Sequence, residues 1–254
     1  MPHEFHGKTV LVTGASRGIG AATATALARA GAARVLLHYN SYLQGAEEVL
    51  CAVREAGADA ALFQANLATV PGIAALIARL RDAGAAVDIL VNNAGSLVKR
   101  AQLFEVSEEL YDTVMTLNVK SAYFLTQALA PGMIERDGGV VVNLSSIAAR
   151  NGGGLGATVY AAAKAAVMTM TKGLARELAP KGIRVNAVSP GTVDNYFHQQ
   201  FSNRQILDSV QAATPAGRLG TNEEIADTIV FLCSDAARYI HGQTIEINGG
   251  MLAP

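Results

Sequence analysis

The chain has 254 residues; 50% are hydrophobic, only 16% are charged, and the formal net charge is −1. With no long run of one sign, this composition argues against a nucleic-acid or membrane-surface partner. No apolar run reaches the roughly 18 residues of a membrane-spanning helix, and the N-terminal segment lacks the pattern of a signal peptide. We therefore expect a cytoplasmic protein, in which the low charge reflects either buried helices or surface covered by partner subunits.

Two cysteines, Cys51 and Cys233, lie in apolar helical patterns. Neither has a Cys or His nearby at the spacing of a metal site, and the five histidines show no such spacing either. We expect two buried free thiols rather than a disulfide, and no metal.

Short runs of branched residues alternate with longer helical patterns along the whole chain. In the first half the sequence predicts strands at 9–14, 34–39, 61–67 and 87–95, with helices at 19–31, at 45–57 and from Pro71 onward. In the second half it predicts a helical region at about 107–135, strands at 138–146, 182–191 and 243–249, and helices from 158 to about 179 and at 222–234.

This alternation is typical of an α/β protein with a doubly wound parallel sheet, a Rossmann fold of about seven strands with helices on both faces. Uninterrupted runs such as "VLV" and "VVV" favour strands that are covered on both sides. No Pro/Gly/Ser-rich linker divides the chain, so we expect a single domain over 1–254. The least regular segment, 192–220, is a candidate lid over the substrate.

The first strand runs directly into "TGASRGIG", which places glycines at 14, 18 and 20. Such glycines allow a tight turn and a close approach of the backbone to a ligand, and the helix N-terminus offers free N–H groups to a pyrophosphate. A plain turn is the structural alternative. A nucleotide-triphosphate loop is disfavoured because no G-K-[S/T] follows.

The choice of cofactor is read at the end of the second strand, where an acidic residue would bind a ribose hydroxyl and repel a 2′-phosphate. This chain has "HYNS" at 38–41, with no acid. Arg17 can pair with a phosphate, and Asn40 and Ser41 can add hydrogen bonds. We expect NADP rather than NAD, while an exposed loop arginine without a ligand stays open as the alternative reading of Arg17.

Four polar residues carry the candidate chemistry, namely Asn118, Ser146, Tyr160 and Lys164. Tyr160 and Lys164 stand four residues apart on one helix face, and a nearby ammonium group lowers the pKa of a phenol. Ser146 ends the fifth strand, where it can hydrogen-bond a substrate oxygen that gains negative charge. A serine hydrolase is disfavoured because "NLSSI" is not a G-x-S-x-G elbow.

With these motifs in order, the sequence resembles the classical short-chain dehydrogenase/reductase family over essentially its whole length. The resemblance rests on "TGASRGIG", "NNAG" at 92–95, "LNV" around Asn118, "LSS" ending at Ser146, "YAAAK" at 160–164 and "SPG" at 189–191. The 3-oxoacyl-[acyl-carrier-protein] reductases are the most similar members. Asn66-Leu67 replaces the commoner Asp-hydrophobic pair near the adenine, and Asn there also occurs among those reductases.

The resemblance implies a role for each of these residues. Tyr160 is the general acid/base, Lys164 binds the nicotinamide ribose, Ser146 rather than Ser145 orients the carbonyl, and Asn118 holds a water in a proton relay. Asn92 mainly steadies the sheet. The expected cofactor contacts are Gly14, Ser16, Arg17, Gly18, Ile19, Gly20, Tyr39, Asn40, Ser41, Asn66, Leu67, Asn93, Ala94, Gly95, Tyr160, Lys164, Pro190, Gly191, Thr192 and Val193.

The sequence leaves the substrate open. A 3-oxoacyl thioester, another ketone, and a sugar or polyol are all compatible with an NADP-dependent oxidoreductase, and a non-catalytic NADP-binding regulatory protein is the distant alternative. The substrate determinants are expected in 97–100, 147–159 and 192–213. Tyr196, Phe197 and Phe201 either form an apolar substrate wall or merely pack against one another. By family resemblance we expect a homotetramer, with uncharged faces around 111–130 and 158–170 available for contact.

Overall fold

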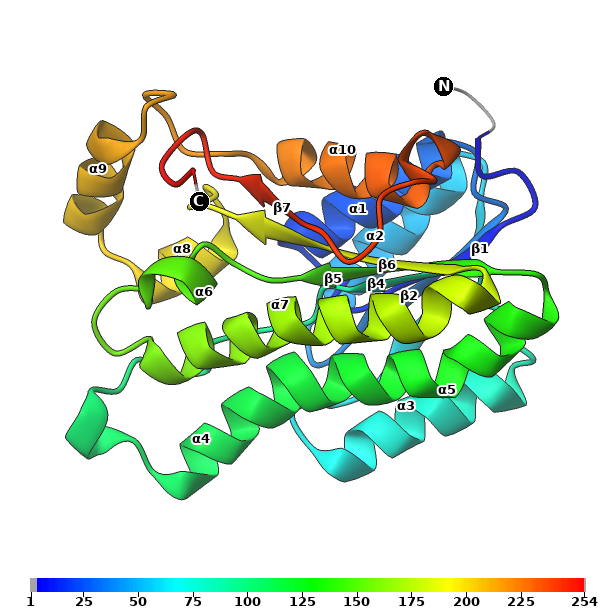
Figure 1. Ribbon diagram of the computed structural model, residues 1–254, viewed down its shortest axis with the longest axis horizontal. Helices are drawn as coiled ribbons and strands as arrows, with labels where there is room; N and C mark the ends of the chain where they lie inside the picture. The colour runs from blue at the N-terminus through cyan, green and yellow to red at the C-terminus, as the bar shows by residue number, and fades with distance from the viewer. Residues whose placement is uncertain (1–3, 254) are drawn as a thin grey trace.

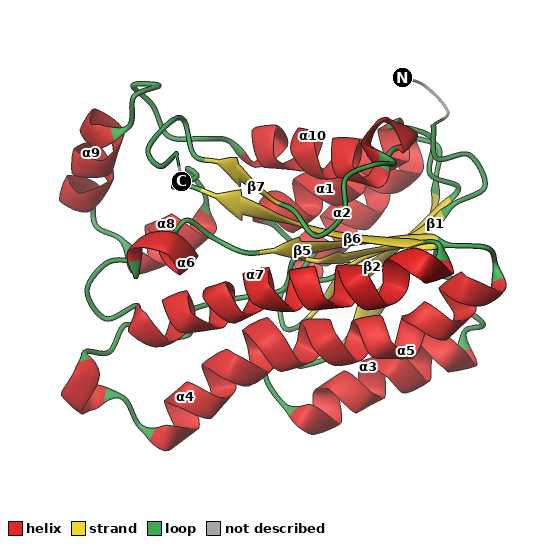
Figure 2. Ribbon diagram, viewed as in Figure 1, coloured by secondary structure: helices red, strands yellow, loops and turns green. Residues whose placement is uncertain are grey.

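The computed structural model describes residues 4–253, and in them one parallel sheet lies between two layers of helices (Figures 1 and 2). The described part contains seven strands in the order β3-β2-β1-β4-β5-β6-β7, and every neighbouring pair is parallel. The order reverses beside β1, so the loops after β1 and β4 leave a crevice at the carboxyl edge of the sheet. The predicted α/β Rossmann fold is confirmed.

The strands are short, buried runs of mostly branched residues. They are β1 (Thr9–Val12), β2 (Arg34–Tyr39), β3 (Asp59–Gln64), β4 (Ile89–Asn92), β5 (Gly139–Leu144), β6 (Ile183–Pro190) and β7 (Thr244–Ile247). Val10, Leu11 and Val12 are completely buried because helices cover both faces of the sheet. Most strands end before their predicted boundary, where the chain turns into the loops that form the site.

One face of the sheet is covered by α1 (Gly18–Arg29), α2 (Leu43–Glu55) and α10 (Asn222–Cys233). Small side chains such as Ala24 and Ala28 let α1 pack along α10, where Ile225 and Ile229 complete the core. The opposite face is covered by α3 (Val70–Asp82), α4 (Glu108–Met115), α5 (Ser121–Glu135) and α7 (Thr158–Leu178).

The helical region predicted at 107–135 is continuous but not uniform. A wide π-helical turn at Thr116–Lys120 joins α4 to α5. Such turns inside α-helices are frequent at functional sites. This turn carries Asn118, whose side chain is buried between the helices and the sheet edge.

The candidate lid is more regular than its composition suggests, because it contains α8 (Tyr196–Phe201) and α9 (Arg204–Ala213). Asparagine side chains start both helices: Asn195 accepts a hydrogen bond from Phe197 N–H and Asn203 accepts one from Ile206 N–H. The predicted irregular segment is therefore two short helices on a loop.

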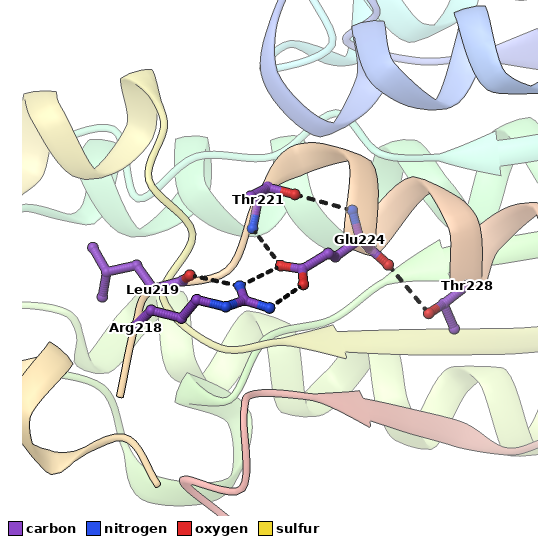
Figure 3. Close-up of polar contacts among 5 residues, drawn as sticks. All are labelled: Arg218, Leu219, Thr221, Glu224 and Thr228. Atoms are coloured by element: carbon purple, nitrogen blue, oxygen red, sulfur yellow. Dashed lines mark hydrogen bonds and ion pairs between the residues drawn. The ribbon is translucent and has the colours of Figure 1, made fainter. Parts of the chain in front are cut away.

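Both ends of this lid are tied to one fixed base. Gly220 N–H donates to Thr192 O and Asp194 N–H donates to Gly220 O, each at 3.0 Å. Figure 3 shows the adjoining anchor, in which the Arg218 guanidinium pairs with both carboxylate oxygens of Glu224. Glu224 and Thr221 also form a reciprocal cap at the start of α10. The two ends of the segment are thus held together.

The two cysteines are free, but only Cys233 is buried. The prediction was wrong for Cys51, which is exposed. Val49 and Val53 lie one helical turn apart and form the buried face of α2, so Cys51, two residues from each, points toward solvent.

No helix among residues 4–253 is long and apolar enough to cross a bilayer. The same residues contain no group of three or more His, Cys, Asp or Glu that could hold a metal ion.

Short helical turns complete the fold: α6 (Ala148–Asn151) and single 3₁₀ turns at Leu103–Glu105, Ala179–Lys181 and Asp235–Ala237.

Candidate active site

A cavity of about 590 Å³ is lined by residues at the carboxyl ends of the strands and by residues of the candidate lid. Loops after β1, β4, β5 and β6 line it, together with α7 and α8. Of the predicted site residues, those at the cavity wall are Gly14, Arg17, Gly18, Ile19, Asn93, Ala94, Gly95, Ser146, Tyr160, Lys164, Pro190, Gly191, Thr192 and Val193. The structure therefore brings the glycine turn and most of the candidate chemistry to one place.

The remaining predicted residues lie beside the cavity rather than in its wall. Ser16 is half-buried in the glycine turn, Tyr39 is the last residue of β2, Asn40 and Ser41 follow it, and Asn66 follows β3. Gly20 and Leu67 are buried, and Leu67 packs in the core with residues of α3. The cofactor contact expected of Leu67 stays a prediction, and its side chain is 2% exposed.

The turn between β1 and α1 is shaped for an anionic ligand. A methyl group at Gly20 would collide with the carbonyl oxygen of Gly14 and the side-chain amide of Asn93, so only glycine lets the helix approach the strand this closely. Arg17 occupies the N-cap position of α1 and makes no side-chain capping bond. The first N–H groups of the helix thus stay free for a pyrophosphate.

His38 supports the glycine turn through a hydrogen bond, a role that was not predicted from the sequence. Its Nδ1 accepts a hydrogen bond of 3.0 Å from Gly14 N–H, and its Nε2 lies 3.1 Å from Ala65 O. The proton must therefore be on Nε2, which donates to that carbonyl. Burial lowers the pKa of His38 to about 4. The signal available in the sequence was a histidine inside a strand that is predicted to be buried.

Arg17 lies between two aromatic rings. Its guanidinium carbon is 4.1 Å from the ring centroid of Tyr42 on one side and 4.1 Å from that of Tyr196 on the other. Both contacts are of the cation–π kind, and the guanidinium N–H groups can still donate to an acceptor. The stack also links the glycine turn to α8. Tyr42, directly before α2, was not among the predicted residues.

Tyr160 and Ser146 both lie in the cavity wall. Ser145 is buried instead, with its hydroxyl donating to Lys164 O at 2.9 Å. The geometry therefore fits Ser146, not Ser145, as the serine that faces a substrate. The loop between them and α7 includes the short helix α6.

The expected lowering of the Tyr160 pKa is not what the structure gives. Burial raises the pKa of this phenol to about 12, and the hydrogen bond from Ser146 opposes the rise only in part. The Nζ atom of Lys164 is 5.6 Å from the centroid of the ring. Desolvation of the phenolate outweighs the attraction of an ammonium group at that distance.

Lys164 and Asn118 approach each other beside Gly95. A methyl group at Gly95 would lie 2.6 Å from Asn118 Oδ1 and 2.8 Å from Lys164 Nζ. Lys164 donates to Leu144 O at 2.7 Å, and burial lowers its pKa to about 8. Asn118 Nδ2 donates to Ser96 O and Val114 O, while Oδ1 is buried and has no partner within residues 4–253.

Two side chains of "NNAG" have separate tasks. Asn92 donates to Asn143 Oδ1 at 2.9 Å inside the sheet, and Asn143 in turn donates to Thr171 of α7. Asn93 donates to the carbonyl oxygens of Thr13 and Gly14. Asn92 thus fixes α7 against the sheet, whereas Asn93 shapes the glycine turn.

Aromatic residues of α8 close the other side of the cavity. The Phe197 ring centroid is 5.8 Å from that of Tyr160 and 5.0 Å from that of Phe201. Both rings line the cavity. The two readings left open by the sequence are therefore compatible: the aromatic side chains pack together and also form an apolar wall.

These features fit a nicotinamide dinucleotide. The uncapped start of α1 and the small residues around Gly95 give room and donors for its phosphates and nicotinamide ribose. The unpaired Oδ1 of Asn118 and the ammonium of Lys164 offer an acceptor and a donor at the same point.

Comparison with known proteins agrees with this geometry. A family model described as enoyl-(acyl carrier protein) reductase matches residues 14–252. The 3-oxoacyl-[acyl-carrier-protein] reductase FabG of Staphylococcus aureus is 38% identical over 244 residues, which are 96% of this chain and 98% of that protein.

Two solved structures are similar over essentially their whole length. A Beutenbergia cavernae protein assigned as an NAD(P)-dependent gluconate 5-dehydrogenase, with bound NADP, has a TM-score of 0.91 and 37% identity, and the match covers 100% of both chains. The NADH-dependent reductase A1-R′, responsible for alginate metabolism, has a TM-score of 0.86 and 36% identity over 99% of this chain and 100% of its own. The relatives share a fold and differ in the substrates that their names give.

Proposed function

The chain belongs to the short-chain dehydrogenase/reductase family, and from that membership we propose an NADPH-preferring enzyme that reduces a carbonyl or oxidises a secondary alcohol. The observation that carries the proposal is the meeting of Ser146, Tyr160 and Lys164 beside the glycine turn in one cavity. When bound, the nicotinamide accepts or supplies the hydride; the chain's own residues move the proton.

Tyr160 is the proposed general acid and base. In reduction its phenol gives a proton to the substrate oxygen, and in oxidation it takes the proton back. Ser146 donates a hydrogen bond to the same oxygen, where negative charge develops. A pKa of about 12 keeps the phenol protonated at neutral pH, which is the form that reduction requires.

Lys164 is proposed to replace the proton that Tyr160 gives up. Its pKa of about 8 lets it exchange a proton near neutral pH, and Asn118 Oδ1 points to the same space. A water held between these two groups would complete a relay from the phenol toward the helix turn at 116–120. Protonated Lys164, together with the positive charge of an oxidised nicotinamide, would favour the phenolate during oxidation.

The preference for NADPH is proposed from the chemistry at the end of β2. Arg17 contacts Tyr42 shortly after the strand, Asn40 and Ser41 are exposed directly after it, and no acid follows it. A 2′-phosphate would meet donors only. Steady-state kinetics with both cofactors test this directly; equal or better kcat/KM with NADH would reject it.

A 3-oxoacyl thioester is one candidate substrate, supported by curated relatives named for that reaction. A sugar acid or polyol is the second, supported by the solved relatives named for gluconate and alginate metabolism. A panel of carbonyls and alcohols with both cofactors, including a 3-oxoacyl thioester, separates them. Absence of turnover across the panel would favour the non-catalytic regulatory alternative.

We also propose that the enzyme works as a homotetramer in the cytoplasm, as one domain over 1–254 with the lid at 192–220. Tyr111, Tyr123 and Phe124 of α4 and α5 are each more than two-fifths exposed in a single chain and could be covered by another copy. The two free cysteines suit a reducing compartment. A monomer in light scattering would reject the assembly.

A further inference from the structure

The charge of the cavity wall is one-sided. Arg17, Arg100 and Lys164 line it, and among residues 4–253 no Asp or Glu does. Arg17 belongs to the glycine turn and Lys164 lies beside Tyr160, so the cofactor accounts for both. Arg100 comes from the loop after β4 and faces the lid, where the cofactor gives no reason for a cation.

Arg100 is held in place by two neutral groups. Its Nε donates to Phe201 O at 2.7 Å, and its Nη1 donates to Leu155 O at 2.8 Å. These bonds fix it between the end of α8 and the loop before α7. No hydrogen bond from Nη2 and no carboxylate partner is found within the described range. This half-buried guanidinium therefore carries a positive charge that no carboxylate in the described range neutralises, and it would attract a negatively charged ligand.

The pKa of His198 reflects the electrostatic potential at this end of the cavity. Burial and, next, the positive charge of Arg100 lower its pKa to about 4, and Asp194 opposes them only in part. A second positive charge is thus disfavoured in this region. A negative one would be attracted for the same reason.

We propose that Arg100 binds a carboxylate of the substrate, so that the substrate class is an oxo or hydroxy acid. The inference rests on the proposed function, because it assigns a substrate class to the same site. Both terminal nitrogens of Arg100 keep an N–H for a carboxylate, whose planar shape the guanidinium matches. Between Arg100 and Tyr160, Phe197 and Phe201 offer an apolar wall for the carbon chain.

The test compares acids with matched neutral esters. The probes are oxo acids of increasing chain length, from 4-oxopentanoate to 7-oxooctanoate, each with its methyl ester. Binding to the enzyme–NADPH complex is measured by calorimetry, and reduction is then measured separately. The best acid is expected to bind about ten- to a hundred-fold more tightly than its ester, as for a charge-assisted hydrogen bond.

Arg100→Met should abolish this preference. The matched control is Arg204→Met, which removes an arginine from the lid helix α9 that pairs with Asp208 on the surface and does not line the cavity. The control should keep the full preference. Arg100→Lys should keep part of it, since an ammonium still attracts the carboxylate, and provides a second readout if Arg100→Met does not fold.

Three results would overturn the inference. The ester could bind as tightly as the acid, none of the acids could bind, or Arg100→Met could weaken acid and ester equally, which would make Arg100 only an anchor of the lid. Failure of the proposed function looks different: the acid preference would persist while no probe is reduced.

Discussion

The ammonium nitrogen of Lys164 lies 5.6 Å from the ring centroid of Tyr160 and donates a hydrogen bond to the carbonyl oxygen of Leu144. It therefore acts on the phenol through its charge rather than through a hydrogen bond to the phenol oxygen. Burial raises the pKa of the phenol to about 12. A positive charge added nearby must therefore offset a large desolvation cost before the phenolate forms.

Replacing Lys164 with Met should slow turnover by about 100-fold and shift the pH profile of oxidation to more alkaline pH. The reason is that the phenolate loses its nearby positive charge, at about 1.4 kcal/mol for each pKa unit. The measurement is kcat against pH in the direction of alcohol oxidation. Lys172→Met is the control, since Lys172 lies on α7 but is exposed. An unchanged pH profile would remove the electrostatic role of Lys164.

Replacing Arg17 with Met should raise the Kd of NADPH by about ten-fold or more and that of NADH much less, because only NADPH carries the 2′-phosphate. Fluorescence titration of both cofactors measures it. Arg17 also stacks on Tyr196, so Tyr196→Leu serves as the control that removes one of its two aromatic contacts and keeps the charge. That variant should affect both cofactors alike. An equal loss of NADH affinity in Arg17→Met would contradict the assignment.

His38 predicts a loss of stability in mild acid. Its pKa is about 4 in the folded protein and 6.5 ordinarily, so between these values the unfolded chain binds more protons. The free energy of unfolding should therefore fall as pH drops from about 6.5 to 4, by up to roughly 3 kcal/mol from this residue. Urea unfolding at several pH values measures the slope. His38→Asn should flatten it, and the same slope in that variant would assign the effect to other groups.

Removing Arg100 should raise the pKa of His198 from about 4, because the positive charge of Arg100 now lowers it while Asp194 acts in the opposite sense. Burial remains the largest cause, so the pKa should stay below 6.5. NMR titration of the imidazole in the wild type and in Arg100→Met provides the comparison. No change in the His198 pKa would mean that the two groups are not electrostatically coupled.

The order of elements could be predicted from the sequence because branched runs and glycine-closed helices alternate without interruption. The turn at 14–20 and the pair Tyr160–Lys164 were also readable, since their meaning lies in local spacing. The wide turn at Thr116–Lys120 was not, because a single extra residue per turn leaves the helical pattern of "TLNVK" almost unchanged.

Other features depend on segments that are distant in the sequence. The stack of Arg17 on Tyr42 and Tyr196 requires the lid to fold back over the glycine turn. The raised pKa of Tyr160 depends on how completely the cavity wall excludes water, which spacing does not reveal. The exposure of Cys51 was not predicted because the residues on both sides of it in the sequence are apolar, which made this position of α2 look buried.

The central claim is that the Tyr160 phenol carries the proton of the reaction, and Tyr160→Phe tests it most directly because it removes a single oxygen atom. Turnover of the best substrate in the panel and NADPH binding by calorimetry are measured on the same preparation. We predict a loss of about 100- to 10,000-fold in kcat, with the Kd of NADPH changed by no more than a few-fold. Turnover at the wild-type rate by a variant that still binds NADPH would contradict the account.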